Sequence, residues 1–262
     1  ATFKKVMDRE KIIQEITKKK EFSQLPEIDV KMALEKFDKG NKLDEEKIKL
    51  TRELLHKVFS SFTSSKLLSP KNKSEEWILR KHLSTRERLP YYKEIYQKIL
   101  SRFKGRVSVI DLGAGINGFS YNFFRDVGTN VDYIGIEAIG QLVDITNDYF
   151  EKEKLKGKIV HLSLFELDKI KEIINGTKKP KVIFLFKTID SLEIMENNYS
   201  LKLIKETIPS VDLIVLSFAV ESMVKRKKFK TSRKWIVDFI NNNFKIKDDF
   251  VVGGERYLCF TQ

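Results

Sequence analysis

The stretch V-S-V-I-D-L-G-A-G-I-N-G, residues 107–118, joins an apolar run to an acid and a tight glycine turn. A run of this kind predicts a strand that is buried in a parallel sheet. A second apolar strand follows and ends in Glu137. The order strand, glycine turn, helix, strand and acid is typical of a nucleotide site at the carboxyl edge of a parallel sheet.

Two glycines and one acid carry the chemistry of this stretch. Gly113 and Gly115 have no Cβ, so the backbone can turn sharply and a ligand can approach it closely. Glu137 can accept hydrogen bonds from both hydroxyls of a ribose. The third glycine of G-x-G-x-x-G is missing, and Asp111 precedes the turn. The pattern resembles the S-adenosylmethionine site of Rossmann-like methyltransferases, and the alternative is a glycine turn without function.

Strands and helices alternate from residue 107 onward. Strands are predicted at 107–111, 131–137, 158–162, 181–187, 211–217, 244–251 and 256–261. Helices are predicted at 119–127, 140–154, 166–174, 191–206 and 231–242. Gly253 and Gly254 form a hairpin signal, so the last strand should run antiparallel to its neighbour. Residues 105–262 are therefore expected to form an α/β domain with a seven-stranded, Rossmann-like class I methyltransferase sheet.

Residues 1–104 are predicted to form an all-α domain. Apolar periodicity and helix-start residues place helices at 3–20 and 28–38 and after Asp44, Ser74 and Pro90. Asp44 and Ser74 are the candidate N-caps. Residues 63–73 contain serine, lysine and proline and are predicted to be a linker.

The positive charge of the chain is concentrated in this first part. Residues 1–104 contain 26 Lys and Arg and 16 Asp and Glu, a net charge of +10 within a total of +13. A basic segment attached to a nearly neutral domain favours a polyanionic partner, and RNA is the simplest one. The alternative is an ordinary solvated surface that is rich in lysine and glutamate.

Several classes of protein are disfavoured by composition. There is no apolar run of about 18 residues, so no membrane span is expected. The N-terminal segment is charged and helical in pattern, unlike a signal peptide. Cys259 is the single cysteine, which excludes an internal disulfide and favours the cytoplasm. The three histidines are scattered, so no metal site is expected.

The segment H-L-S-T-R-E-R-L, residues 82–89, precedes the first predicted strand. Ser84, Arg86 and Arg88 have the chemistry to hold a cofactor carboxylate or an RNA phosphate. The alternative is a helix start, with Ser84 or Thr85 as N-cap and Glu87 completing a capping box.

This segment resembles the H-x-S-T-R-E-R-L signature of the aminoglycoside-resistance 16S ribosomal RNA (guanine-N7) methyltransferases. The turn at 111–117 resembles the family's D-x-x-C-G-x-N, with Ala114 in place of the cysteine. Residues 185–193 resemble its L-x-K-x-x-x-x-L-E, and residues 216–222 its V-S-F-P-x-K-S. The resemblance runs from about residue 77 onward. Ala219 and Glu221 depart from it, which leaves the RNA target open.

The resemblance implies an S-adenosylmethionine-dependent RNA methyltransferase that acts on guanine N7 of the small ribosomal subunit, as a monomer. The turn, the strand ends and the signature together nominate the cofactor-binding residues Ser84, Arg86, Arg88, Asp111, Gly113, Ala114, Gly115, Asn117, Glu137, Ala138, Ser163, Leu164, Phe165 and Phe186. Two alternatives stay open: a methyltransferase for another RNA, and a non-catalytic RNA-binding or ribosome-assembly protein with this fold.

Further residues are nominated for catalysis and RNA contact. Lys187 would lie at the mouth of the fourth strand against the RNA or the target base, and Glu193 would order a neighbouring arginine or the base edge. The alternative places Lys187 in solvent and Glu193 in a first helical turn. The nominated RNA-binding residues follow the fifth strand: Lys225, Arg226, Lys227, Lys228, Lys230 and Arg233. Guanine N7 has no proton to lose, whereas ribose 2′-O methylation, with Lys187 as a base, is not excluded.

Overall fold

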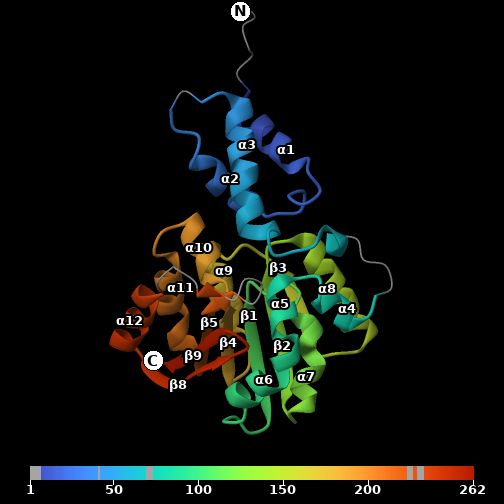
Figure 1. The fold of residues 1–262 in the computed structure, drawn as a ribbon, viewed down its shortest axis with the longest axis vertical. Coiled ribbons are helices and arrows are strands. Elements are labelled where there is room, and N and C mark those ends of the chain that lie inside the picture. The colour runs from blue at the N-terminus through green and yellow to red at the C-terminus, as the bar shows by residue number, and fades with distance from the viewer. Residues whose placement is uncertain (1–6, 41, 69–72, 223–226, 229–232) are drawn as a thin grey trace, which may run out of the picture.

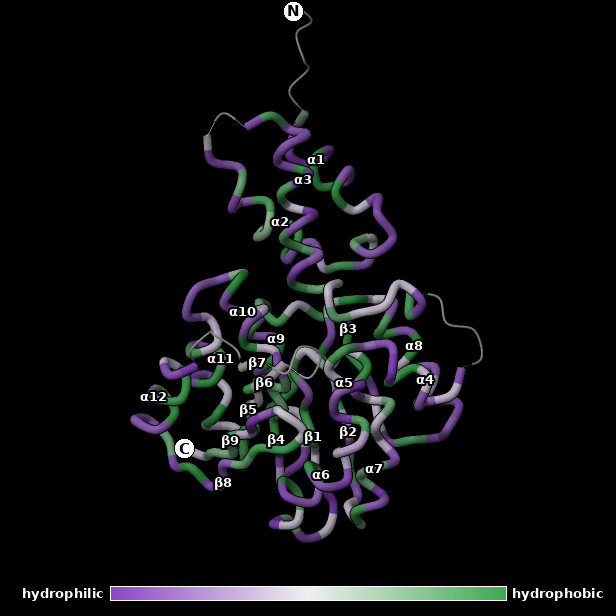
Figure 2. Tube along the Cα trace, in the orientation of Figure 1, coloured by the Kyte–Doolittle hydropathy of each residue, from purple (hydrophilic) through white to green (hydrophobic). Residues whose placement is uncertain are grey.

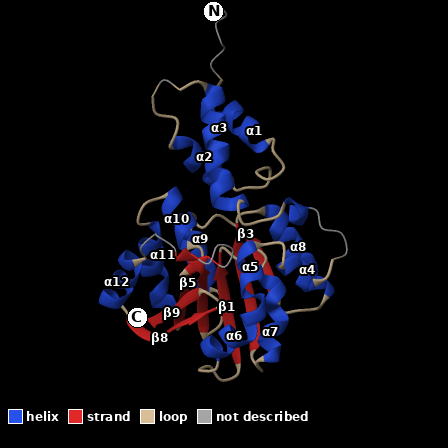
Figure 3. Cartoon of the chain, viewed as in Figure 1, coloured by secondary structure: helices blue, strands red, loops and turns tan. Residues whose placement is uncertain are grey.

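The computed structural model describes residues 7–40, 42–68, 73–222, 227–228 and 233–262. A large sheet forms the centre, with helices on both of its faces, and a bundle of three helices lies beyond one end of the strands (Figure 1, Figure 3). The strands are mostly hydrophobic, whereas the bundle mixes hydrophilic and hydrophobic segments (Figure 2).

The sheet has seven strands in the order β3-β2-β1-β4-β5-β9-β8. Their bounds are Arg106–Leu112 (β1), Asn130–Glu137 (β2), Gly157–His161 (β3), Lys181–Phe186 (β4), Leu213–Ala219 (β5), Lys245–Val252 (β8) and Glu255–Thr261 (β9). Strands β1 to β5 are parallel to one another, and β9 is antiparallel to both β5 and β8. A separate short ladder pairs Glu221–Ser222 (β6) with Lys227–Lys228 (β7). The predicted seven-stranded sheet with a closing antiparallel hairpin is confirmed.

Helices cover the sheet because its strands are apolar on both faces. The helices that follow β1 are Tyr121–Asp126 (α7), Gly140–Lys152 (α8), Leu167–Asn175 (α9), Ile189–Met195 (α10), Tyr199–Thr207 (α11) and Lys234–Asn243 (α12). Val107 and Val109 of β1 lie in one hydrophobic core, with α7 and α8. Ile110 and Leu112 lie in a second core, with α9, α11 and α12. The alternation of strand side chains therefore divides the domain into two buried layers.

The helices before β1 form two groups that lie in different parts of the molecule. Arg9–Thr17 (α1), Glu27–Glu35 (α2) and Asp44–Leu55 (α3) form the separate bundle, and a π-helical turn, His56–Ser60, continues α3. Glu75–Leu79 (α4), Leu83–Arg88 (α5) and Tyr92–Leu100 (α6) lie alongside the sheet instead (Figure 1). The predicted linker contains a 3-10 turn, Ser65–Leu68, while residues 69–72 lie outside the described residues.

The bundle is docked on the carboxyl ends of the strands by hydrogen bonds to the sheet domain. The N–H of Gly140 donates to the carbonyl of Gln24 at 3.3 Å, and the amide of Gln141 donates to the carbonyl of Lys20 at 2.8 Å. The hydroxyl of Ser191 donates to the carbonyl of Val58 at 3.2 Å. The bundle therefore covers the edge of the sheet at which the glycine turn lies.

Two local predictions are wrong for physical reasons. The helix expected at 191–206 is two helices, because Asn198 adopts a left-handed φ of 62° between α10 and α11. Asp44 is not an N-cap: Leu43 holds that position, and the Asp44 carboxylate accepts a hydrogen bond from the N–H of Met7 at 2.7 Å. Ser74 is the N-cap of α4, as expected, and accepts from the N–H of Trp77.

Within the described ranges, no helix has both the length and the hydrophobicity to cross a membrane. The same residues contain no group of three or more His, Cys, Asp or Glu side chains arranged to hold a metal ion.

Candidate cofactor site at the carboxyl edge of the sheet

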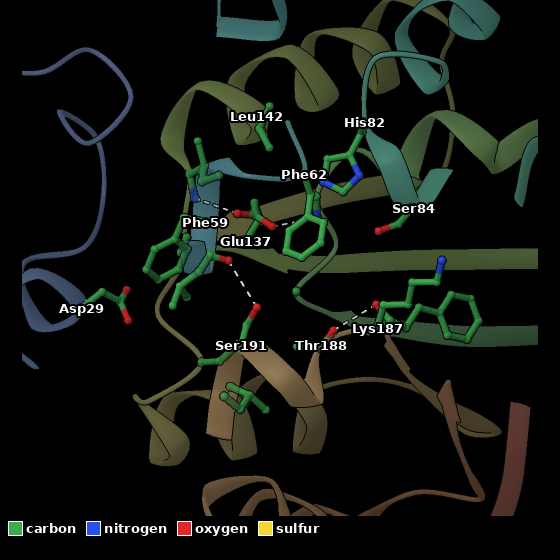
Figure 4. Close-up of a pocket in the computed structure, with 18 of the residues that line it drawn as sticks. Asp29, Phe59, Phe62, His82, Ser84, Glu137, Leu142, Lys187, Thr188 and Ser191 are labelled. Carbon is green, nitrogen blue, oxygen red and sulfur yellow. Dashed lines mark hydrogen bonds between the residues drawn. The ribbon is translucent and has the colours of Figure 1, made fainter. Parts of the chain in front are cut away.

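A cavity lies between the carboxyl ends of the strands and the helical bundle (Figure 4). It contains about 780 Å³ of empty space, including the solvent at its mouth. The sheet domain lines it with the glycine turn, the end of β2, the loop after β3 and the end of β4. The bundle lines it with α2 and the π-helical turn.

The glycine turn bends back onto the end of β2. The N–H groups of Gly113 and Ala114 donate to the carbonyl of Ile136 at 2.9 and 3.0 Å. Gly113 and Gly115 have φ values of 77° and 53°, in the left-handed region that favours glycine. A Cβ on Gly113 would lie 2.9 Å from a side-chain carbon of Thr188. The turn therefore needs glycine both for its conformation and for the space between β1 and β4.

Glu137 lies at the centre of the cavity, where β2 ends (Figure 4). Its two carboxylate oxygens accept from the N–H of Gly115 at 2.7 Å and from the N–H of Ile139 at 2.8 Å. Burial raises the pKa of Glu137, although these N–H groups favour the charged form. The side chain is only 6% exposed, yet it lines the cavity. Each oxygen keeps a lone pair, so the carboxylate can accept further hydrogen bonds from a ligand.

Asp111 and Asn117 do not line the cavity. The Asp111 carboxylate accepts from the side chains of Asn117 at 2.7 Å and Tyr133 at 2.6 Å, and Asn117 accepts from the hydroxyl of Tyr92 at 2.7 Å. Burial raises the pKa of Asp111. The two residues hold the turn from beneath rather than reaching the ligand space, and Ala114 is likewise buried outside the lining.

Arg88 is also placed away from the lining, in a buried ion pair. It is 3% exposed, and its Nε donates to both carboxylate oxygens of Glu255, at 3.2 and 3.1 Å. Its guanidinium carbon lies 4.9 Å from the ring centre of Phe186. Burial alone would raise the pKa of Glu255, but Arg88 and then Lys187 hold that pKa below its usual value. The pair joins α5 to the last strand.

Lys187 is at the end of β4 and does line the cavity. Its φ of 55° is left-handed, and its N–H donates to the hydroxyl of Ser217 at 3.2 Å. Its ammonium group pairs with Glu87 and lies 3.4 Å from a carboxylate oxygen of Glu255. The ammonium group of Lys187 is therefore engaged by two carboxylates at the edge of the cavity.

The residues of the H-L-S-T-R-E-R-L segment lie on different sides of helix α5. Ser84 lines the cavity, whereas Arg86 is exposed and lies in a groove with residues of α4. The predicted alternative of a Ser84 or Thr85 cap is wrong, because His82 is the N-cap residue. Thr85 is buried and donates to the carbonyl of Leu79 at 2.6 Å.

Two further nominated residues have structural partners. Glu193 is outside the cavity lining and accepts from the N–H groups of Asn198 at 2.6 Å and Ser200 at 3.0 Å, so it caps the start of α11. Arg233 is mostly buried and pairs with Asp190 at 2.6 Å. Lys225, Arg226 and Lys230 lie outside the described residues, and of Lys227 and Lys228 only the backbone is described.

Several lining residues were not predicted. Asp29, Phe59 and Phe62 come from the helical bundle, where no local pattern indicates a ligand. His82 is half-buried against Gly115, and desolvation of its ring lowers its pKa to about 3. Its place at the head of the signature segment was a usable signal. Of the other nominated residues, Ala138, Leu164, Phe165 and Phe186 line the cavity, and Ser163 lies just behind it.

The residues that are present fit a nucleoside ligand. A Cβ at Gly113 would collide with the opposite wall, and Glu137 presents a carboxylate from the floor of the same space. Apolar side chains from the β3 loop and from β4 complete the walls. A flat base, a ribose with two hydroxyls and a cationic group match this combination of apolar and acidic surfaces.

The strand order, the glycine turn and the cavity above it define a class I methyltransferase fold. The chain belongs to the ribosomal RNA methyltransferase (FmrO) family, whose sequence profile matches residues 72–235. The resemblance inferred from the signature segments is thus confirmed.

Individual relatives agree with this membership. A 16S rRNA (guanine(1405)-N(7))-methyltransferase of Proteus mirabilis is 25% identical over 191 residues, which cover 71% of this chain and 64% of the relative. The match therefore spans less than two thirds of that relative. The 16S rRNA methyltransferase RmtF, solved with S-adenosyl-L-homocysteine, aligns over 98% of this chain and 100% of its own, with a TM-score of 0.76 and 18% identity. An rRNA methylase from Escherichia coli aligns over 97% and 99%, with a TM-score of 0.74 and 16% identity. These two structures share the fold.

Proposed function

We propose that this chain is an S-adenosylmethionine-dependent enzyme that methylates guanine N7 in small-subunit ribosomal RNA. The observation that carries the proposal is the joint placement of Gly113, Gly115 and Glu137 in one cavity of a chain that belongs to an rRNA methyltransferase family. The curated relative is a guanine-N7 enzyme, which supports this choice of acceptor atom.

Different residues of the chain would contact different parts of the cofactor. Glu137 would accept from the ribose hydroxyls, and the glycine turn would let the backbone approach the ligand. Leu164 and Phe165 would pack against the adenine, since they line the wall beside β3. Ser84, near the opposite wall, is placed for the methionine part (Figure 4).

The chemistry asks little of the protein in acid–base terms. When bound, S-adenosylmethionine supplies a methyl group on a sulfonium, which is already a strong electrophile. Guanine N7 has a lone pair in the ring plane and carries no proton. The protein has to align the acceptor with the methyl group and exclude water. Lys187, whose ammonium group pairs with Glu87, would contribute to the surface that the RNA meets at the cavity mouth.

The RNA would approach over the helical bundle and the mouth of the cavity. Of the net charge of +10 in residues 1–104, residues 1–60 carry +3 and residues 61–104, which include the helices alongside the sheet, carry +7, so the basic charge favours both segments as contact surface. We propose that the bundle is the RNA-binding domain, that the protein acts as a monomer on the small ribosomal subunit, and that it does so in the cytoplasm.

Replacing Glu137 by alanine is expected to weaken binding of S-adenosylhomocysteine by about 1–3 kcal/mol, because ribose hydroxyls and two backbone N–H groups lose their acceptor. Calorimetric titration measures this change. Asp144→Ala, which removes an exposed carboxylate from α8, is the matched control and should bind as the wild type does. Equal affinity in the Glu137→Ala protein would refute the placement of the ribose.

The activity is tested by incubating the protein with methyl-labelled S-adenosylmethionine and, in separate reactions, small ribosomal subunits, naked ribosomal RNA and transfer RNA. We expect label in the small subunits. Borohydride and aniline treatment followed by primer extension should reveal one cleavage, because this chemistry cuts the strand at 7-methylguanosine.

Other outcomes would change the assignment in defined ways. Label in transfer RNA alone would make the chain a methyltransferase for another RNA. Cofactor binding without transfer to any of the three substrates would favour the non-catalytic alternative. Label without borohydride-dependent cleavage would exclude N7 as the acceptor.

A further inference from the structure

Asp29 is a buried acid that the helical bundle contributes to the cavity. It belongs to α2, lines the cavity and is 1% exposed. It is far in sequence from every motif of the sheet domain. Asp29 lies in the first turn of α2, where the helix dipole favours a carboxylate, and its neighbours in that helix, Val30 and Ala33, are buried apolar residues.

One oxygen of Asp29 is engaged and the other is not. Oδ1 accepts from the hydroxyl of Ser163 at 2.8 Å, and Ser163 follows β3. Oδ2 is buried and has no hydrogen-bond partner among the described residues. A buried carboxylate oxygen without a partner costs free energy, so it marks a place where a donor belongs.

The surroundings specify the kind of donor. Burial, and then the nearby carboxylates of Glu137 and Glu166, disfavour negative charge on Asp29 and raise its pKa to about 7. The walls beside it are Leu164 and Phe165. A flat, apolar ring that carries an N–H donor on its edge satisfies both features, since the ring packs on the walls while the donor meets Oδ2.

The position of Asp29 gives the orientation. Figure 4 shows Asp29 and Lys187 at opposite ends of the cavity, with Glu137 between them. In the proposed function Glu137 would hold the ribose and the methionine part would lie toward Ser84, on the side of Glu137 away from Asp29 (Figure 4). The base attached to that ribose then extends toward α2, and its exocyclic edge faces Asp29.

We propose that Asp29 is the residue that recognises the 6-amino group of the adenine, so that the helical bundle completes the cofactor site of the sheet domain. Oδ2 accepts the hydrogen bond of the amine, while the Ser163 hydroxyl holds Oδ1 in place. The inference rests on the proposed use of an adenosine cofactor. It adds that a residue outside the methyltransferase sheet selects a 6-amino over a 6-oxo purine.

The test compares two ligands that differ only at this edge. S-adenosylhomocysteine and S-inosylhomocysteine are titrated by calorimetry into the full chain at pH 8. The wild type should bind the adenosyl compound at least about tenfold more tightly, because in the inosyl compound the 6-oxo oxygen, an acceptor, would face Oδ2 and the donor on that edge is moved to N1. In Asp29→Asn an amide can donate to the 6-oxo group, so the ratio of the two affinities should fall to about one or below.

Using a ratio within each protein separates recognition from folding. Glu27→Gln removes an exposed carboxylate from the same helix and should keep the wild-type ratio. Equal binding of both ligands by the wild type, or an unchanged ratio in Asp29→Asn, overturns the role of Asp29 and leaves the proposed function standing. Failure of the wild type to bind either ligand overturns the proposed function itself.

Discussion

Replacing Arg88 by methionine is expected to destabilise the fold by about 3–5 kcal/mol, because the change leaves the carboxylate of Glu255 buried without its main partner. Both side chains are almost fully buried, at 3% and 2% exposure. Lys187 and Ser217 remain next to Glu255 but compensate only part of the loss. Urea unfolding monitored by circular dichroism measures the difference.

The neighbouring arginine provides a matched control. Arg86 lies in the same helix but is exposed, so Arg86→Met should change stability by no more than about 0.5 kcal/mol. It should also leave the affinity for S-adenosylhomocysteine unchanged. A loss of less than about 1 kcal/mol in Arg88→Met would show that this pair behaves like a surface salt bridge.

The pH dependence of the Arg88 effect has a definite sign. In the wild type the folded pKa of Glu255 is lowered from 4.5, so the stability contributed by its charged form is present above that value and is lost as pH falls. Without Arg88, burial dominates and the folded pKa rises, so the carboxylate destabilises the variant above pH 4.5 and does so less as it gains a proton. The difference between the two proteins should therefore shrink as pH falls toward 4.5.

The sheet could be predicted closely because its signals are local. The central strands β1, β4 and β5 are short apolar runs, and Gly253 and Gly254, both with positive φ, form the predicted hairpin. The local pattern fails to predict a helix end that is made by a side chain several residues away. The apolar period of 191–206 continues through the break, but the Glu193 carboxylate caps the second helix and allows the chain to turn at Asn198.

The lining of the cavity could be predicted at the glycine turn and just after the strand ends, where Ala138, Leu164 and Phe165 also lie. The glycine turn and Glu137 could be predicted because a turn with positive φ requires glycine and because Glu137 directly ends an apolar strand, and both features are visible in the sequence. Arginines 86 and 88 have the chemistry to bind a carboxylate, yet one is exposed on the far side of α5 and the other is buried against Glu255. Glu255 is 167 residues from Arg88 in the sequence, so no local pattern predicts that Glu255 pairs with this arginine.

Asp29 was missed for the same reason. It is an ordinary helix residue in the sequence, and it becomes part of the site only because α2 docks beside Ser163. Contacts between segments that are 134 residues apart depend on tertiary packing and are not encoded by periodicity. Residues that a second domain adds to a site are therefore the hardest to predict from the sequence.

Replacing Asp29 by asparagine is expected to stabilise the ligand-free protein at high pH. The pKa of Asp29 is raised from 3.8 to about 7 in the fold, so below pH 3.8 both states are protonated and the carboxyl costs nothing. Between these values the unfolded state loses its proton while the folded state keeps it, so wild-type stability falls as pH rises. Above pH 7 the full cost of up to about 4 kcal/mol is present. Urea unfolding of both proteins from pH 4 to pH 8 measures it.

The difference between the two proteins isolates Asp29 from the other buried acids. The raised pKa of Asp111 is common to both proteins and cancels, whereas the advantage of Asp29→Asn should be near zero at pH 4 and largest at pH 8. Glu27→Gln should show no such trend, since Glu27 is exposed. A constant difference across this range would mean that Asp29 carries no burial cost. An advantage that grows with pH, combined with weaker binding of S-adenosylhomocysteine, would identify a carboxylate that lowers stability in order to complete a binding site.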